Sequence, residues 1–188
     1  QLEEKWENYP VLHLDLNAEK YDAPERLDAI LSNQLTQWEL VYGKGVDETT
    51  LSNRFKGVIQ RASEKTGKGV VVLVDEYDKP LLQAFHNKDL LEAYRLTLKA
   101  FYGVLKSADK YLRFVFLTGV TKFSQVSVFS DLNQLNDISM HQAYSAICGM
   151  TKDELIDFFK PEMKDLADAN DMTIDETIEQ MTAQYDGY

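Results

Sequence analysis

The feature that most constrains the fold of this chain is an unbroken apolar run at residues 70–74, VVVLV, followed at once by Asp75 and Glu76. β-Branched side chains and leucine suit the pleated surface of a strand. A strand that is apolar on both faces is typical of a parallel sheet with helices on either side. The run therefore predicts a central strand of an α/β sheet, with two acids at the carboxyl end, where such sheets bind ligands.

Other segments supply further elements for such a sheet. Apolar runs predict strands at residues 10–17 and 114–117, and a short apolar segment at residues 143–148 is expected to add another. Apolar residues at helical spacing predict three helices, the first of them capped by Asp22. These helices span residues 23–38, 52–65 and 89–107. Strands that alternate with helices indicate an α/β sheet with right-handed crossovers.

The character of the sequence changes after residue 149, which predicts two domains. We expect an α/β core at residues 1–149 and a small helical, lid-like region at residues 150–188. The tract TKDE, beginning at Thr151, has the spacing of a capping box and predicts the start of a helix. Pro161 is expected to interrupt that helix, and a second helix is predicted at residues 175–185.

The composition excludes several classes of protein. The formal net charge is −11 and no run of Lys or Arg offsets it, so we expect this segment to bind neither nucleic acid nor an anionic membrane surface. Cys148 is the single cysteine, which rules out an intramolecular disulfide and favours a cytoplasmic location. No segment resembles a signal peptide or reaches the roughly 20 apolar residues of a membrane helix. Because the sequence starts at Gln1 and stops at Tyr188, within the tract YDGY, we expect it to be part of a longer protein.

The acids that follow residue 74 have the chemistry that nucleotide hydrolysis needs. Asp75 could hold Mg²⁺ directly or through a water, and Glu76 could accept a proton from the attacking water. Asp78 adds a third acid, and Lys79 could neutralise one of the three. The alternative stays open that the strand ends in acids because aspartate favours the turn that follows.

Thr118 ends the next apolar strand. In ATPases with an additional strand between the phosphate-loop strand and the acidic strand, the additional strand ends in a polar residue that contacts the γ-phosphate and orients the attacking water. A threonine hydroxyl can donate a hydrogen bond to either of them. Alternatively, Thr118 caps a turn before Gly119. Lys122 could face the same phosphate, although most lysines are solvated surface residues.

Three long tracts of the chain closely resemble the AAA-ATPase-like family of bacterial proteins, which is common in Bacteroidetes and related anaerobes. They are VVVLVDEYDKPLL, YRLTLKAFYGVLKSADKYLRFVFLTGVTKFSQVSVFSDLNQLNDIS and YSAICGMTKDEL. The resemblance extends over nearly the whole chain, from PVLHLDLN to YDGY, with the tracts in the same order.

This resemblance implies a P-loop NTPase-like fold of the additional-strand class, mostly parallel, followed by a small helical region. It implies that Asp75 and Glu76 are the Walker B acids, with Asp75 as the Mg²⁺ ligand and Glu76 as a catalytic residue. Thr118 corresponds to the catalytic sensor position and, with Asp75 and Lys122, would contact the nucleotide. Mg²⁺ and ATP are the implied cofactors of the full-length protein, and many members carry a PD-(D/E)XK nuclease-like domain at the carboxyl end.

The chain departs from the family in one respect. Family members carry a Walker A phosphate loop, but residues 1–188 contain no G-x-x-x-x-G-K-[ST] motif. The two Gly-Lys-Gly tracts, at residues 43–45 and 67–69, have the context of turns. We therefore interpret the chain as a fragment that begins after the Walker A motif, lacks the central strand, and binds nucleotide weakly or not at all.

Three functions follow as hypotheses. The first is an ATPase module, and the second is a non-catalytic interaction or regulatory module built on an NTPase scaffold. The third, a nuclease, lacks support because the chain contains no spaced Asp and Glu-x-Lys acids on a pair of strands. Arg54 could act as an arginine finger only if an oligomer placed it in a neighbouring site, and the oligomeric state is not predicted.

Overall fold

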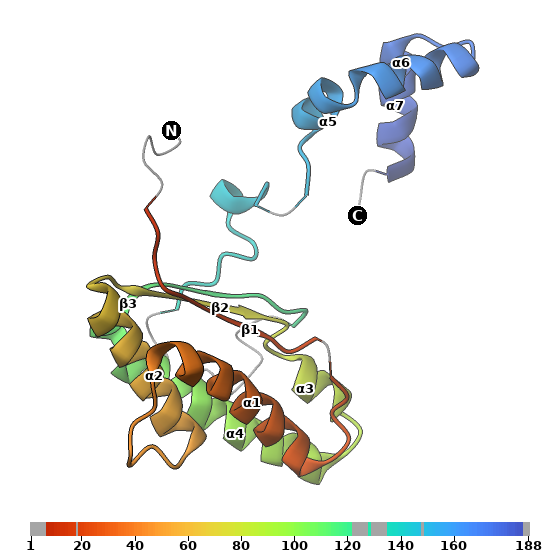
Figure 1. Ribbon diagram of the computed structural model, residues 1–188. Coiled ribbons are helices and arrows are strands. Elements are labelled where there is room, and N and C mark those ends of the chain that lie inside the picture. Colours follow the sequence, from red (N-terminus) through yellow and green to blue (C-terminus); the bar gives the residue numbers. More distant parts are fainter. Residues whose placement is uncertain (1–6, 18, 122–127, 129–134, 148, 186–188) are drawn as a thin grey trace. The chain divides into compact units, whose positions relative to one another are not determined.

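The computed structural model describes residues 7–17, 19–121, 128, 135–147 and 149–185 (Figure 1). The chain forms two compact units, Gln1–Asn136 and Asp137–Tyr188. The domain boundary predicted after residue 149 lies within the second unit and stays a prediction. Among the described residues, no helix has both the length and the apolar character needed to cross a membrane.

In the part of the first unit that the structure describes, a parallel three-stranded sheet forms the centre. Its strands are β1 (Val11–Asp15), β2 (Val70–Asp75) and β3 (Leu112–Leu117), and β2 lies between the other two. Each strand runs parallel to its neighbour, with Leu14 opposite Val74 and Val74 opposite Leu117. The predicted α/β class and the three strands within this unit are confirmed.

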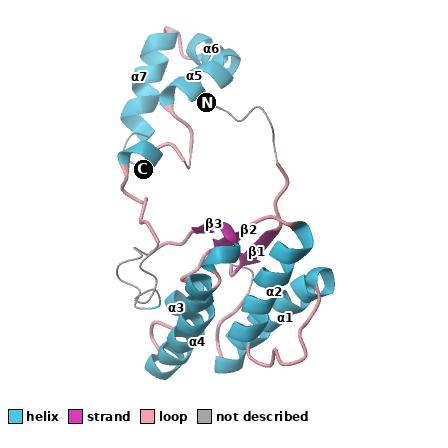
Figure 2. Cartoon of the chain, turned by 90° about the vertical axis from the view of Figure 1, so that its left-hand side faces the viewer, coloured by secondary structure: helices cyan, strands magenta, loops and turns pink. Residues whose placement is uncertain are grey.

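The long helices of the first unit lie on one face of the sheet, as Figures 1 and 2 both show. They are α1 (Pro24–Tyr42), α2 (Leu51–Thr66) and α4 (Lys88–Ser107). Two shorter elements follow β2 and α4, namely α3 (Lys79–Gln83) and the 3₁₀ turn η1 (Asp109–Tyr111).

The sequence predicted a β2 buried on both faces, and for the described residues this is wrong. Val72 and Val74 are buried under the helices, whereas Val71 and Leu73 on the other face are half-buried. On the same open face, Phe114 of β3 leaves 53% of its surface exposed. Apolar side chains on both faces of a strand are therefore not enough to predict that helices cover both faces of the sheet.

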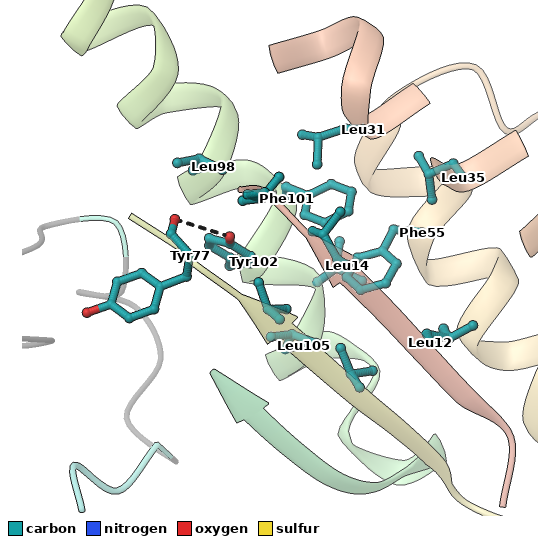
Figure 3. Close-up of a cluster of buried hydrophobic side chains, with 14 of the residues drawn as sticks. Leu12, Leu14, Leu31, Leu35, Phe55, Tyr77, Leu98, Phe101, Tyr102 and Leu105 are labelled. Atoms are coloured by element: carbon teal, nitrogen blue, oxygen red, sulfur yellow. Dashed lines mark hydrogen bonds between the residues drawn. The ribbon is translucent and has the colours of Figure 1, made fainter. Parts of the chain in front are cut away.

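Leucines from β1 and the helices pack against a stack of aromatic rings between the sheet and the helices (Figure 3). Phe55 lies between Trp38 and Phe101, with ring centroids 5.8 Å and 4.4 Å away. The helices thus converge on rings that are almost fully buried, and burying such side chains contributes about 1.5–3 kcal/mol each. The fully buried leucines of this cluster include Leu12, Leu14, Leu27, Leu31, Leu35 and Leu98.

Local signals explain where the helices begin and end. The Thr50 and Asn87 side chains accept hydrogen bonds from the backbone at the starts of α2 and α4, and α2 ends at Gly67 with φ +65°. The predicted cap of α1 is wrong, because Ala23 holds the capping position ahead of a proline. Asp22 instead forms exposed ion pairs with nearby basic side chains.

The described residues of the second unit form three α-helices, α5 (Lys152–Phe158), α6 (Lys160–Ala169) and α7 (Ile174–Tyr185). The capping box at Thr151 is confirmed, and Pro161 occupies the first turn of α6.

The strand predicted at residues 143–148 is wrong for the residues of that segment that the structure describes. A 3₁₀ turn, η4 (Gln142–Tyr144), and further turns occupy this part of the chain. Its described side chains are exposed, so its apolar residues do not form the buried face that a strand in a sheet would have.

Candidate active site at the carboxyl ends of β2 and β3

The sheet brings Asp75 and Thr118 together. Because β2 and β3 are parallel and in register at Val74 and Leu117, both strands end at the same edge of the sheet. The Thr118 amide donates to the Val74 carbonyl at 2.9 Å, which carries the ladder one residue past β3. The Thr118 hydroxyl then donates to Asp75 Oδ1 at 2.5 Å. An acid and a hydroxyl, 43 residues apart in sequence, therefore share one exposed edge.

The Asp75 carboxylate keeps one oxygen available. Its Oδ1 atom accepts from the Thr118 hydroxyl and from the Glu76 amide, the latter at 3.1 Å. Within the described part of the chain, Oδ2 accepts no hydrogen bond, and the residue is exposed. An exposed carboxylate oxygen of this kind is available to a cation or to a bound water.

Glu76 has an unusual backbone conformation. Its φ angle of +55° lies in the left-handed region, which costs an L-residue roughly 1 kcal/mol. The Lys79 amide donates to the Glu76 carbonyl at 3.0 Å and closes the turn between β2 and α3. Such strained residues cluster at ligand sites and active sites, which makes Glu76 a candidate site residue beside Asp75.

Asp78 stabilises the fold and is not a third acid at the exposed edge. Its side chain is 1% exposed and points away from solvent. Oδ1 accepts from the Val120 amide at 3.2 Å, while Oδ2 accepts from the Thr121 amide at 2.6 Å and from the Thr121 hydroxyl. These bonds fix the segment that follows β3 and leave Asp78 unable to join Asp75 as a ligand.

Tyr77 and Gly119 complete this contact, and no pattern in the sequence indicates their role. The Tyr77 amide donates to the Thr118 carbonyl at 2.9 Å, and the Tyr77 hydroxyl donates to the Thr121 carbonyl at 2.5 Å. The Tyr77 carbonyl accepts from the buried Tyr102 hydroxyl at 3.5 Å (Figure 3). A Cβ at Gly119 would meet Asp78 Oδ1 and the Tyr77 ring at 2.6 Å, so the close approach requires glycine.

The structure describes one of the two other candidate residues, Arg54, and does not bring it to this site. Lys122 lies outside the described residues. Arg54 is buried between α1 and α2, where it donates to both carboxylate oxygens of Glu39 at 2.7 and 2.8 Å and to Ser32 and Thr36. The hydrogen bonds from Arg54 lower the pKa of Glu39. Because its donors are engaged within the fold, Arg54 does not fit the part of an arginine finger.

The residues of this site could bind Mg²⁺ only together with waters or with phosphate oxygens of a substrate. Among the described residues, no group of three or more His, Cys, Asp or Glu side chains could hold a metal. Mg²⁺ is usually bound through one or two carboxylates together with waters and phosphate oxygens of the substrate. Asp75, with its exposed Oδ2, suits this arrangement as a single protein ligand and does not suit a metal held by the protein alone.

The fold and this edge define a class of protein: an α/β domain whose parallel sheet gathers an acid pair and a hydroxyl at the carboxyl ends of adjacent strands. The chain belongs to the AAA-ATPase-like family, described as "Predicted AAA-ATPase", whose sequence profile matches residues 1–129. The family that the sequence tracts suggested is thereby confirmed.

A relative in Azotobacter chroococcum mcd 1, described as "Uncharacterized protein in vnfD 5'region", is 36% identical over 169 residues. The match covers 88% of this chain but 33% of the relative, so the chain spans about one third of that protein's length. No solved structure matches the chain.

Proposed function

We propose that this chain supplies the acidic half of a Mg²⁺-dependent ATP-hydrolysing site in a P-loop NTPase-like fold. Asp75 would hold Mg²⁺ that also contacts the nucleotide phosphates, and Glu76 would accept a proton from the attacking water. Thr118 would donate its hydroxyl to that water or to the γ-phosphate. Lys122, four residues further on, stays a candidate for contact with the same phosphate.

The observation that carries the proposal is the hydrogen bond between Thr118 and Asp75 across adjacent parallel strands. A γ-phosphate sensor and a Walker B acid must lie within reach of one phosphate group, and this geometry provides that reach. Membership of the AAA-ATPase-like family adds support, since a family of this kind would generally use ATP and Mg²⁺. The strained backbone of Glu76 also fits a residue whose carboxylate must point in a fixed direction.

Nucleotide binding by residues 1–188 alone is expected to be weak. The chain contains no phosphate-loop motif, so it lacks the backbone amides and the lysine that would cradle the phosphates. Asp75 and Thr118 would contact only the metal and the terminal phosphate, which are a small part of such a ligand. We therefore expect hydrolysis from the complete gene product rather than from this segment.

The decisive experiment measures ATP hydrolysis by the complete gene product with and without Mg²⁺. Glu76→Gln should lower kcat at least 100-fold while ATP still binds, because the base is lost and the metal ligand is kept. Asp75→Asn should raise the Mg²⁺ concentration needed for activity. Glu64→Gln, an exposed change on α2, is the matched control and should leave both quantities unaltered. Unchanged turnover in Glu76→Gln would remove Glu76 from the mechanism.

A second function is a non-catalytic interaction or regulatory module. It is favoured by the absence of a phosphate-loop motif from residues 1–188 and by the bond that already satisfies Thr118 and one oxygen of Asp75. Calorimetric titration of Mg-ATP into residues 1–188 and into the complete gene product separates the two functions. Binding by the complete protein alone supports the ATPase, and binding by neither supports the module.

A further inference from the structure

The segment that follows β3 is fastened to the turn that follows β2. Val120 and Thr121 donate three hydrogen bonds to Asp78, two of them at 2.6 and 3.2 Å. Tyr77 adds a bond through its amide to Thr118 and one through its hydroxyl to Thr121. We name this set of contacts, between residues 77–78 and residues 118–121, the strand-end clamp.

We propose that Asp78 is a positioning residue for the candidate site, because through the strand-end clamp it holds Thr118 and Glu76 in place against Asp75. This inference rests on the proposed function and adds to it a residue that does not touch the metal or the nucleotide. Asp78 is 1% exposed, so its carboxylate is withheld from any ligand at the exposed edge.

The chemistry of the clamp favours an aspartate in particular. The carboxylate offers two acceptor oxygens and takes three donors from residues 120 and 121. Hydrogen bonds to an ionised acceptor are shorter and stronger than those between neutral groups. An asparagine has one acceptor oxygen, so its NH₂ group would face at least one of the same donors.

Glu76 shows why the clamp matters for the site. A left-handed glutamate persists only where its surroundings fix the residues on both sides. Before it, Asp75 is held by the Leu16 amide, which donates to its carbonyl at 3.2 Å, and by the Thr118 hydroxyl. After it, Tyr77 and Asp78 are held by the clamp. The strain at Glu76 is therefore balanced by contacts from the segment that carries Thr118.

Gly119 makes the clamp sensitive to shape as well as to charge. Its position between Asp78 and the Tyr77 ring leaves no room for a Cβ, which would lie 2.6 Å from either of them. Any larger residue must move the segment after β3 away from the turn after β2. Because Gly119 directly follows Thr118, such a displacement shifts the hydroxyl relative to Asp75.

The first arm of the test uses amide hydrogen exchange in the complete gene product and needs no activity. In Asp78→Asn, the amides of Tyr77 and Thr118, which do not touch Asp78, should exchange roughly tenfold faster. Gly119→Ala should give the same pattern by displacing the segment. Leu35→Ala, a core truncation in α1 remote from the clamp, is the control for general loss of stability and should not single out these amides.

The second arm measures steady-state hydrolysis of Mg-ATP by the same proteins. A positioning role predicts that Asp78→Asn lowers kcat roughly 10- to 100-fold and changes the KM for ATP less than threefold, since orientation is lost and binding is kept. Leu35→Ala, assayed where it is folded, should keep kcat.

The two arms also separate this inference from the proposed function. Unchanged protection of Tyr77 and Thr118 in Asp78→Asn overturns the positioning role, as does a kcat equal to that of the parent protein. If the parent protein hydrolyses no ATP, the proposed function fails. Faster exchange at Tyr77 and Thr118 would then still support the clamp, and unaltered exchange would overturn it.

Discussion

The two units of the chain differ sharply in how their helices are stabilised. In the first unit, three long helices bury leucines and aromatic rings against a sheet. In the second, the buried side chains among the described residues are Met163, Ala167 and Thr177, while large apolar side chains such as Phe158 remain exposed. Residues 137–188 also contain twelve aspartates and glutamates against three lysines.

This difference shows that the helices of the two units are stabilised by different physical effects. The first unit depends on packing, which fixes a single arrangement of side chains. The second relies more on local bonds, because capping boxes begin two of its three described α-helices, Thr151 with Glu154 for α5 and Thr173 with Glu176 for α7. The candidate site lies in the well-packed unit, which suits a site that needs fixed geometry.

The largest expected effect contrasts a buried and an exposed phenylalanine. Phe101→Ala should lower the free energy of unfolding of the first unit by about 4 kcal/mol, because it removes a ring stacked on Phe55 and leaves a cavity. Phe158→Ala, on a side chain 74% exposed, should change stability by less than about 0.5 kcal/mol. Denaturant unfolding followed by circular dichroism measures both, and equal losses would contradict the contrast.

The next effect concerns the ion pair between α1 and α2. Glu39→Gln should cost about 3 kcal/mol at neutral pH, since it leaves the Arg54 charge buried without a counter-charge. The pKa of Glu39 lies below its ordinary value of 4.5, so its contribution is fully present above pH 4.5 and is lost as the pH falls through the lowered pKa.

The stability gap between the parent chain and Glu39→Gln should therefore shrink in acid. Unfolding curves recorded between pH 7 and pH 3 test this expectation. A gap that stays constant over that range would show that Arg54 does not set the pKa of Glu39.

A smaller effect is expected in the second unit. Thr151→Ala should destabilise α5 by about 1 kcal/mol, because the side chain that accepts from the Glu154 amide is lost. The change should reduce helicity without moving the main unfolding transition of the first unit. Thr182→Ala, within α7, removes a hydroxyl that bonds to its own helix and serves as the control. A shift of the main transition by Thr151→Ala would mean that the two units unfold together.

The smallest effect compares the two non-glycine residues that have a positive φ angle among the described residues. Glu76 and Asp171 have φ angles of +55° and +53°, one in each unit. Glu76→Gly should stabilise the first unit by about 0.5–1 kcal/mol, since glycine adopts this conformation without strain. Asp171→Gly should gain less, because aspartate tolerates the left-handed region better. Thermal unfolding of both variants checks the order, and a loss of stability in Glu76→Gly would contradict the strain at that residue.

Much of the first unit could be predicted because short stretches of the sequence indicate its strands and where they end. The run before Asp75 and the run before Thr118 identify two strands, and parallel pairing then brings their ends together. The prediction that Asp22 caps α1 is wrong because its carboxylate forms ion pairs with two basic side chains, Lys20 and Arg26, instead.

The parts that sequence could not supply depend on contacts between distant residues. Asp78 looks like Asp75 and Glu76 in the tract DEYD, and only its burial against residues 120 and 121 distinguishes it. Gly119 likewise looks like an ordinary turn residue until the Tyr77 ring is seen beside it. The apolar segment at residues 143–148 has strand-like composition, but strands need a partner, and its described residues find none there.

The open face of the sheet has a practical consequence for handling the protein. Phe114 and Phe116 stack on that face, and among the described residues β3 forms its ladder with β2 alone. Chains with an unpaired strand beside an apolar surface tend to add strands from one another. Light scattering of residues 1–188 is therefore expected to rise with protein concentration. Phe114→Lys should suppress that rise, because it places a charge on the exposed apolar face of the sheet.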